Sequence, residues 1–482
     1  MKKRLLSWLL VLTMVTSLIP STLVTTAFAA ADGVTLGASV TEKTLSASDT
    51  SPYEITSSGT YRVTGSSTQP IIVTADAGEV ILVLNGVNIQ SATSPIQLQK
   101  GTLSAAKVTL VVPDGKTAQL ACTSTTKAAA ESADVAGKTA GINVPDGTTL
   151  TIDKISGENG TGTLTISGGY GSAGIGGNHG YGYEGTGYGT TTHSTPITDA
   201  NQQGPLGFGG DGGYVNAPLK GFGGAPGRDG QSAEKSGTVN INACNINITS
   251  TAGAGIGGGQ GASGENGFEG KQGYKAGDAN WVNPAMGSGG GGAGGNGGRG
   301  GDCGPVTING GTLNIKVTAP IAASGQKTSD NMHQITPKDK IQTAGIGGGP
   351  GGWGGFGAKG GDTAPANGHS PSSDYWSSGY GGAGGYGETG YVNYGGAAEA
   401  ITINGGIITV QGVGIAMGSN INAADVRTQA AEQSYAYDYN YNVGKGYQGG
   451  MGAHGGKARA LAAAPTGNAK ISLNGGNISV SS

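Results

Sequence analysis

The sequence predicts an all-β protein, a parallel β-helix whose coils are interrupted by long glycine-rich inserts. Three observations lead to this prediction: a short alternating repeat that returns along the chain, 99 glycines among 482 residues, and aromatic residues gathered between the repeats. Helices are not expected to dominate, because glycine costs about 1 kcal/mol at a helix position relative to alanine. Collagen is excluded, since it needs glycine strictly at every third position.

Residues 1–29 are predicted to be a secretory signal peptide. Three basic residues, Lys2 to Arg4, precede an apolar run that ends at Pro20, and an A-x-A cleavage site follows at Ala27 to Ala29. A membrane anchor helix is the alternative, but the apolar run is short for that role. The mature chain is therefore expected to be exported by a bacterium, outside the cell or at its surface, with no membrane span.

The charge and the cysteine content limit which partners and which covalent or metal cross-links are expected. Charged residues make up 12% of the chain and its formal net charge is −3, so a highly charged disordered protein is not indicated. Lys and Arg form no basic patch, which argues against nucleic acid as a partner. The cysteines, Cys122, Cys244 and Cys303, fit no metal-site spacing. Their odd number leaves at least one thiol unpaired or used between chains, and the sequence leaves open whether Cys244 and Cys303 form a disulfide.

Five segments share one pattern: an apolar residue, a polar residue, another apolar residue, Asn or Ser, and usually two glycines. They are residues 164–169, 239–244, 306–311, 401–406 and 471–476. Alternation on both sides of a Gly-Gly corner predicts two short strands separated by a tight bend. A second signature, A-G-I-G-G, follows three of the units at 173–177, 254–258 and 344–348, with a looser version at 414–418.

Each unit offers too little apolar surface for a core of its own, so the units are expected to stack. Each turn of such a coil adds about 4.8 Å along its axis. The asparagines of these units are expected to lie in register at one corner of the coil, where their side chains hydrogen-bond from turn to turn as a ladder. The ladder candidates are Asn85, Asn242, Asn309, Asn404 and Asn474. Alternatively, each Asn serves only its own turn; neither role is catalytic.

The predicted organisation has three parts: the signal peptide 1–29, an N-terminal cap with the first coils at 30–177, and interrupted coils at 178–482. The inserts span about 178–236, 260–303, 350–398 and 419–468. Gly-Gly-X triplets recur in two of them, at 291–302 and 348–356. A period of three matches a polyproline-II-type helix, and several such strands can pack through their glycine faces. Flexible loops are the alternative.

The aromatic residues of the inserts are the predicted binding site. Every Trp and Phe of the mature chain lies in an insert. In one interpretation the rings form small hydrophobic clusters that hold the glycine strands together. In the other, exposed rings with polar tips stack on sugars or on wet protein surfaces. The candidate carbohydrate-binding or surface-binding residues are Tyr181, Tyr183, Tyr188, Trp281, Trp353, Tyr375, Trp376, Tyr437 and Tyr441.

Five N-terminal segments carry a family resemblance. They are ITSSGTY at 55–61, IIVTAD at 71–76, VILVLNGVNI at 80–89, VTLVVPDG at 108–115 and GTLTI at 162–166. In this order they resemble the secreted clostridial-type carbohydrate-binding β-helix proteins. The resemblance implies a right-handed parallel β-helix, export to the cell surface, and binding of acidic plant polysaccharide such as polygalacturonate, with calcium at acidic sites. This chain departs from the family where acidic turns are replaced by A-G-I-G-G, which removes most of the carboxylates that calcium needs.

No enzyme activity is predicted. The sequence shows no paired carboxylates of the kind that glycoside hydrolysis uses and no established nucleophile or phosphate-binding motif. The histidines lie in or beside glycine-rich or polar loops, where solvated side chains are expected. They are His179, His193, His333, His369 and His454.

The predicted function is therefore that of a secreted, non-enzymatic carbohydrate-binding or adhesive surface protein. No cofactor is called for by the residues themselves. The alternative is a self-assembling structural protein, a filament or surface layer, because the strand at 478–480 is expected to leave an uncovered β-edge. The expected partners are thus a polysaccharide or further copies of the same chain.

Overall fold

The computed structural model describes residues 32–184, 229–262, 264, 297–318, 343–352, 396–416 and 471–481. Strands dominate these residues, which hold only one short α-helix, α2 (Lys127–Ala130), and one 3-10 turn, η1 (Ala75–Ala77). None of the helices within the described ranges has the length and apolarity needed to cross a membrane. The signal peptide, the fourth insert and the middle of the other inserts lie outside the described residues.

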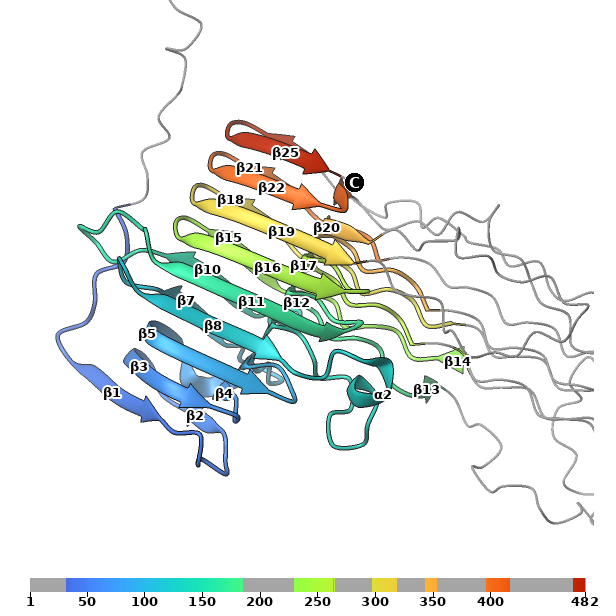
Figure 1. Ribbon diagram of the computed structural model, residues 1–482, viewed down its shortest axis with the longest axis horizontal. Helices are drawn as coiled ribbons and strands as arrows, with labels where there is room; N and C mark the ends of the chain where they lie inside the picture. Colours follow the sequence, from blue (N-terminus) through green and yellow to red (C-terminus); the bar gives the residue numbers. More distant parts are fainter. Residues whose placement is uncertain are drawn as a thin grey trace, which may run out of the picture.

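A parallel sheet of 15 strands contains most of the strands of the described residues (Figure 1). It has two arms that meet at the long strand β5 (Glu79–Ser91), whose first half pairs with β7 and whose second half pairs with β8. On its other side β5 pairs with β3 (Gly59–Ser67), which pairs with β1 (Val40–Leu45). The first arm consists of β7 (Lys107–Val111), β10 (Thr149–Asp153), β15 (Thr238–Ile241), β18 (Val306–Ile308), β21 (Ile401–Ile403) and β24 (Ile471–Leu473). The second arm consists of β8 (Thr117–Cys122), β11 (Thr163–Tyr170), β16 (Asn245–Thr251), β19 (Thr312–Thr318), β22 (Ile407–Gln411) and β25 (Asn477–Ser481).

A second parallel sheet has eight strands. They are β2 (Tyr53–Ile55), β4 (Ile71–Val73), β6 (Ile96–Leu98), β9 (Ile142–Asn143), β12 (Ile175–Gly176), β17 (Ile256–Gly257), β20 (Ala344–Gly347) and β23 (Val413–Ala416). The A-G-I-G-G signature supplies β12, β17 and β20, which pair in register through their isoleucines. A separate antiparallel pair joins β13 (Tyr183–Glu184) to β14 (Asp229–Gly230) at the start and end of the first insert.

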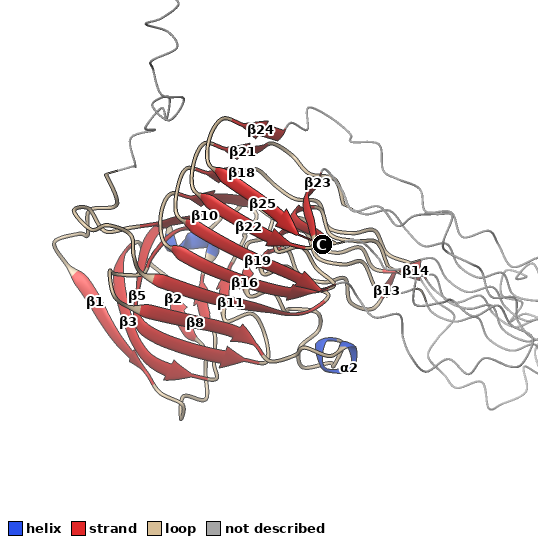
Figure 2. Cartoon of the chain, turned by 45° about the horizontal axis from the view of Figure 1, so that its top comes forward, coloured by secondary structure: helices blue, strands red, loops and turns tan. Residues whose placement is uncertain are grey.

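Successive strands of the chain enter the first arm, the second arm and the second sheet in turn. The strands β15, β16 and β17 form one such repeat, and β18, β19 and β20 form the next. Figure 1 shows these repeats as rungs, and the turned view of Figure 2 shows the strands of each arm side by side. The predicted all-β class and the parallel stacking of the repeats are confirmed.

The core is aliphatic because alternate residues of each strand point inward. In β18, Val306 and Ile308 are fully buried while Thr307 between them is half-buried. The register places Ile308 between Ile241 of the preceding repeat and Ile403 of the next. Identical inward positions therefore pack on one another from repeat to repeat, and burying each such side chain contributes about 1.5–3 kcal/mol.

The predicted asparagine ladder is present at the corner between the two arms. Side-chain amides donate in sequence, from Asn474 to Asn404 at 2.8 Å, from Asn404 to Asn309 at 2.8 Å, and from Asn309 to Asn242 at 2.9 Å. Asn242 in turn donates to the Asp153 carboxylate at 2.9 Å. Asn85 is not a member, so that part of the prediction was wrong. It lies inside β5, which runs through both arms as one continuous strand and makes no corner there.

A second correction concerns residues 164–169, which do not form the predicted two strands and bend. They lie within the single strand β11, where Leu164 pairs with Ile246 of the second arm. The two glycines serve close packing instead, since a Cβ on Gly169 would lie 2.7 Å from the Ser124 carbonyl oxygen and 2.8 Å from the Cys122 sulfur. The other four segments do bend at the corner.

The described ends of the first three inserts run side by side and are joined by hydrogen bonds that recur every third residue. Gly298 and Gly301 donate to the carbonyls of Ala262 and Gly259, while Gly349 and Gly352 donate to those of Gly301 and Gly298, all at 2.7–2.9 Å. These four donors are the second glycines of Gly-Gly-X triplets.

At the end of the second insert, the third residues of two successive triplets, Arg299 and Asp302, lie on one edge of the segment. The Arg299 guanidinium contacts the Asp302 carboxylate at 2.7 Å, across one period of three. The predicted packing through glycine faces is thus present at the described ends of these inserts.

Breaking the asparagine ladder in its middle is expected to destabilise the stack. Asn404→Ala removes one hydrogen bond to Asn309 and one from Asn474, so the free energy of unfolding should fall by about 1–3 kcal/mol. Urea unfolding followed by circular dichroism measures the change. Thr402→Ala, at the outward position of the strand β21 that precedes Asn404, is the matched control and should cost less. Equal stabilities of the two variants would show that the ladder contributes nothing beyond its turn.

Candidate functional site

The outward side chains of the second arm form a regular polar surface over five strands, β11, β16, β19, β22 and β25. The paired register aligns these side chains in three rows that run along the stack. We call this surface the polar face. Its rows are Thr163, Asn245, Thr312, Ile407 and Asn477; Thr165, Asn247, Asn314, Thr409 and Ser479; and Ser167, Thr249, Lys316, Gln411 and Ser481.

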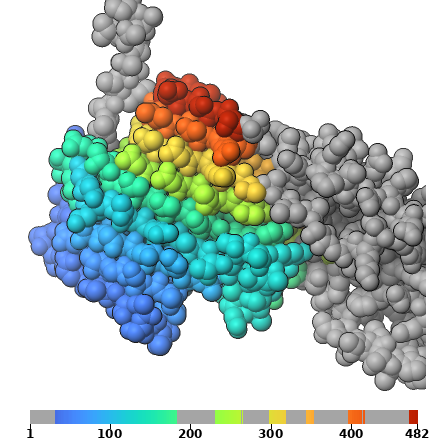
Figure 3. Space-filling model, in the orientation of Figure 1, coloured from blue at the N-terminus to red at the C-terminus, as the bar shows by residue number. Residues whose placement is uncertain are grey.

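The polar face is a lattice of hydroxyl and amide groups. Neighbours within a row lie about 4.8 Å apart, and adjacent rows lie about 6.6 Å apart. Some neighbours bond to each other: the Asn314 amide donates to Asn247 at 3.0 Å, and the Thr249 hydroxyl donates to Ser167 at 2.9 Å. In the space-filling view the repeats follow one another as bands toward the red C-terminal end (Figure 3).

The chemistry of the polar face is hydrogen bonding without charge. Hydroxyl and amide groups both donate and accept hydrogen bonds, so they match ligands rich in hydroxyl groups. Lys316 is the single charged member and Ile407, which is 52% exposed, is the single large apolar one. The rows contain no carboxylate, imidazole or thiol, and their hydroxyl and amide groups can bind a ligand through hydrogen bonds.

The first arm offers a narrower surface. Its strands are shorter, and only one row of outward residues, all of them half-buried, runs along all six strands. That row consists of Thr109, Thr151, Asn240, Thr307, Thr402 and Ser472. The wider second arm is therefore the better candidate for contact with an extended ligand.

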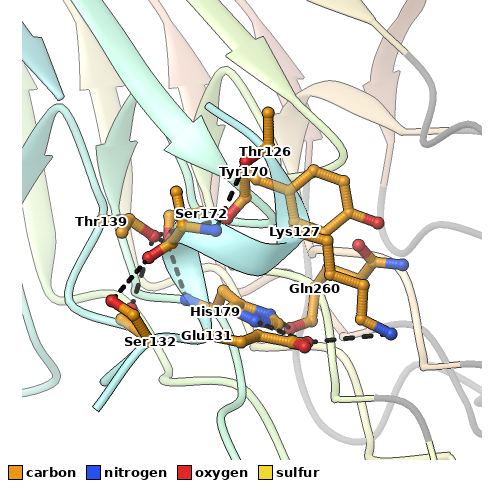
Figure 4. Close-up of polar contacts among 11 residues, drawn as sticks. Thr126, Lys127, Glu131, Ser132, Thr139, Tyr170, Ser172, His179 and Gln260 are labelled. Carbon is orange, nitrogen blue, oxygen red and sulfur yellow. Dashed lines mark hydrogen bonds and ion pairs between the residues drawn. The ribbon is translucent and has the colours of Figure 1, made fainter. Parts of the chain in front are cut away.

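A buried polar cluster ties α2 to the beginning of the first insert (Figure 4). The backbone amide of His179 donates to the Ser172 hydroxyl at 2.8 Å, which lies 2.6 Å from the Thr139 hydroxyl. The His179 ring places Nδ1 3.3 Å from the Gln260 carbonyl oxygen and Nε2 3.4 Å from Glu131 Oε1, the latter without hydrogen-bond geometry. Only 6% of His179 is exposed, so the expectation of a solvated loop histidine was wrong.

The His179 ring of this cluster is withdrawn from solvent, and the neighbouring Tyr170 is half-buried. Tyr170 meets His179 edge to face at 6.1 Å between ring centroids. Burial, with a smaller contribution from the negative charge of Glu131, raises the pKa of Tyr170 to about 12. The sequence signal for the cluster was weak, since Glu131 and His179 lie far apart along the chain. The other four histidines lie outside the described residues.

The three cysteines are unpaired and buried, so the open question of a bond between Cys244 and Cys303 is answered in the negative. Burial raises the pKa of Cys122 to about 11 and those of Cys244 and Cys303 to about 12. Thiols in that state stay protonated near neutral pH and are poor nucleophiles.

A chain of ion pairs links the described ends of two inserts. Lys235 Nζ lies 3.1 Å from Asp146 Oδ1 and 2.8 Å from Glu399 Oε1, and Lys100 contacts Asp146 at 3.4 Å. Its hydrogen bond to Glu399 raises the pKa of Lys235. Burial acts to raise the pKa of Asp146, but the hydrogen bonds and charges of Lys235 and Lys100 lower it overall. The two positive and two negative charges balance, so these groups hold Asp146, Lys235 and Glu399 together by ion pairs.

Calcium, which the family resemblance implies, does not fit the described residues. Within them no group of three or more His, Cys, Asp or Glu gathers as metal ligands do. The acidic residues that do cluster, Asp146 and Glu399, are held by Lys235. No binding step is therefore assigned to a metal.

Glu234 is a second structural carboxylate, at the end of the first insert. It is half-buried and accepts hydrogen bonds from Asn143 Nδ2 at 2.7 Å and from the backbone N–H of Asn178 at 3.0 Å. Burial raises the pKa of Glu234, and the hydrogen bonds from Asn178 and Asn143 counteract part of that effect. Folding therefore makes ionisation of Glu234 less favourable than it is in the unfolded chain.

Glu234→Gln is expected to unfold at a higher temperature than the parent near neutral pH. A carboxyl group whose pKa is raised by folding destabilises the folded state when ionised, and that penalty disappears as the pH falls through the raised pKa. The two proteins should therefore converge below about pH 4. Thermal unfolding across this pH range measures the difference. A variant less stable than the parent at every pH would contradict the assignment.

The described residues include little of the predicted aromatic site. Tyr181 is half-buried near the start of the first insert, and Tyr183 belongs to β13. The remaining candidates lie outside the described residues: Tyr188, Trp281, Trp353, Tyr375, Trp376, Tyr437 and Tyr441. The prediction of an aromatic binding site therefore stays a prediction.

Comparison with known proteins finds no matching protein-family model and no matching curated protein. Among solved structures, the chain is similar to a polysaccharide lyase-like protein from C. thermocellum, with 14% sequence identity and a TM-score of 0.28. The alignment covers 92% of each chain. So low a TM-score supports no conclusion about the fold or function of this chain.

Proposed function

We propose that this protein is a secreted, non-enzymatic carbohydrate-binding or adhesive surface protein. The stack of parallel strands is, in this proposal, a right-handed parallel β-helix with polyproline-II-type glycine segments at the start and end of its inserts. Parallel strands joined through a crossover in one sheet are right-handed in about 98% of cases. The hydrogen bonds repeated every third residue between glycine segments support the three-fold conformation.

The observation that carries the functional proposal is the polar face. Its rows place hydroxyl and amide groups at a constant spacing across five strands, and sugars present hydroxyl groups at a similarly regular spacing. A rigid sheet holds these groups in place before binding, which lowers the entropy lost when a ligand is bound. The hydroxyl and amide groups of the three rows are suited to hydrogen-bond a ligand, so binding is the role that the face supports best.

Sedimentation with insoluble polysaccharides tests this proposal. The parent is expected to be depleted from solution by at least one polysaccharide, and a variant with Asn247→Lys and Thr409→Lys on the polar face should stay in solution. The matched control carries Asn240→Lys and Thr402→Lys on the first arm and should bind like the parent. If only changes at Tyr375 and Trp376 abolish binding, the site lies in the inserts and the polar face is not the binding surface.

End-to-end self-assembly is the second candidate, favoured by one observation at the last repeat. Leu473 and Val480 are 59% and 52% exposed, whereas Ile403 and Val410, their partners one repeat earlier, are fully buried. An uncovered strand edge with apolar side chains can pair with another chain. Electron microscopy and light scattering at high concentration test this candidate, and a monodisperse monomer would exclude it.

A further inference from the structure

The polar face has a charge pattern that discriminates between kinds of polysaccharide. A polyuronate such as polygalacturonate carries one carboxylate on each sugar, and cations at a matching spacing favour its binding. Lys316 is the one cation among the three rows. A neutral polymer requires only donors and acceptors, which every strand of the face supplies except at Ile407.

The geometry of the polar face sets the direction of an extended ligand. Each of the three rows runs along the stack, with one member per strand and about 4.8 Å between members. That distance is close to the length of one sugar ring in an extended chain. Across the strands the spacing is about 6.6 Å, so the two outer rows flank a ring that lies on the central row. A chain laid along the stack therefore meets one set of three outward side chains at each sugar.

From these observations, and resting on the proposed function, we propose that the polar face binds a neutral, unbranched polysaccharide along the stack, one sugar per repeat. The central row, which includes Asn247, Asn314 and Thr409, supplies the main hydrogen bonds. The bond from Asn314 to Asn247 orients both amides before the ligand arrives. A protein partner is disfavoured, because the face lacks the aromatic and arginine anchors that dominate protein interfaces.

Calorimetric titration with β-1,4-linked gluco- and manno-oligosaccharides, from the disaccharide to the octasaccharide, tests this inference on the full chain. Each added sugar is expected to raise affinity by about threefold to fivefold, the effect of one net hydrogen bond, up to the pentasaccharide. Longer chains should show no further comparable gain, because the third row ends at β11 and continues on the next strand, β8, as the apolar Ala121. Galacturonate oligomers of equal length should bind at least tenfold more weakly.

A matched pair of variants locates the ligand. Asn247→Lys on the central row should weaken pentasaccharide binding at least tenfold, whereas Asn240→Lys on the first arm should leave it unchanged. Both asparagines are half-buried, outward-facing and in the same repeat. Circular dichroism is the check that both variants fold.

Different failures have different meanings. Binding of galacturonate oligomers alone would overturn this inference and leave the proposed function intact, whereas binding of no polysaccharide would overturn both. Affinity that does not depend on chain length, or equal losses in the two variants, would also overturn the inference. Dimerisation that Asn247→Lys abolishes would make a second copy of the chain the occupant of the face.

Discussion

Gly349→Ala is expected to disrupt the packed glycine segments at the start of the third insert. A Cβ at this position would lie 1.9 Å from the Gly259 carbonyl oxygen and 2.4 Å from its carbon. The backbone cannot withdraw freely, because Gly349 also donates to Gly301 and accepts from Gly396. Overpacking of a side chain costs about 1–3 kcal/mol, and a clash between two backbones should reach or exceed the upper value.

Thermal unfolding and limited proteolysis measure the effect of Gly349→Ala. The control is Gly101→Ala, because a Cβ there would meet its nearest neighbour, the Ala75 Cβ, at 3.2 Å and no backbone atom closer than that. The control is expected to change stability by less than about 1 kcal/mol. If Gly349→Ala were as stable and as resistant to protease as the control, the close approach of these segments would be refuted.

Ile308→Ala is expected to have a comparably large effect on the coil itself. Ile308 is fully buried, and its strand neighbours in the register are Ile241 and Ile403. Removing its branched side chain leaves a cavity between two repeats, which costs about 2–5 kcal/mol for such truncations. Urea unfolding followed by circular dichroism measures the loss.

Thr307→Ala is the natural control for Ile308→Ala, since it changes the adjacent, outward position of the same short strand. It should cost no more than about 1 kcal/mol, within the range of strand propensities. Similar losses for both variants would mean that the aliphatic stack does not hold the repeats together. A selective loss of signal from the later repeats would instead show that each repeat depends mainly on its neighbours.

Much of the fold could be predicted because the signals are local and repeated. Alternation around the corner of 306–311 predicts two short strands with Val306 and Ile308 inward, and the structure confirms both. The fourth position of each such unit is an asparagine, namely Asn242, Asn309, Asn404 and Asn474, so the asparagines align once the units stack. Asn85 shows the limit of this reasoning, because local pattern alone cannot distinguish a corner from the continuous strand β5.

The candidate site was less accessible to sequence reasoning. The aromatic residues stand out in a glycine-rich chain and were therefore predicted as the site. Asn247, Asn314 and Thr409 have the pattern of ordinary outward positions in amphipathic strands. Their significance depends on the parallel register that aligns them across strands far apart in sequence. His179 was likewise placed in a solvated loop, because the segments around Ser172 and Gln260 that bury it come together only in the folded chain.

By itself the sequence determined that this protein is built from β-strands, that repeated aliphatic units must stack to form a core, and that glycine has two uses. These properties depend on side-chain alternation and backbone freedom, which each segment carries locally. The tertiary structure alone decided which strands share an arm, which asparagines form the ladder, and which polar side chains align as a face. Those properties depend on register, which is set by the packing of whole repeats and cannot be read from any one segment.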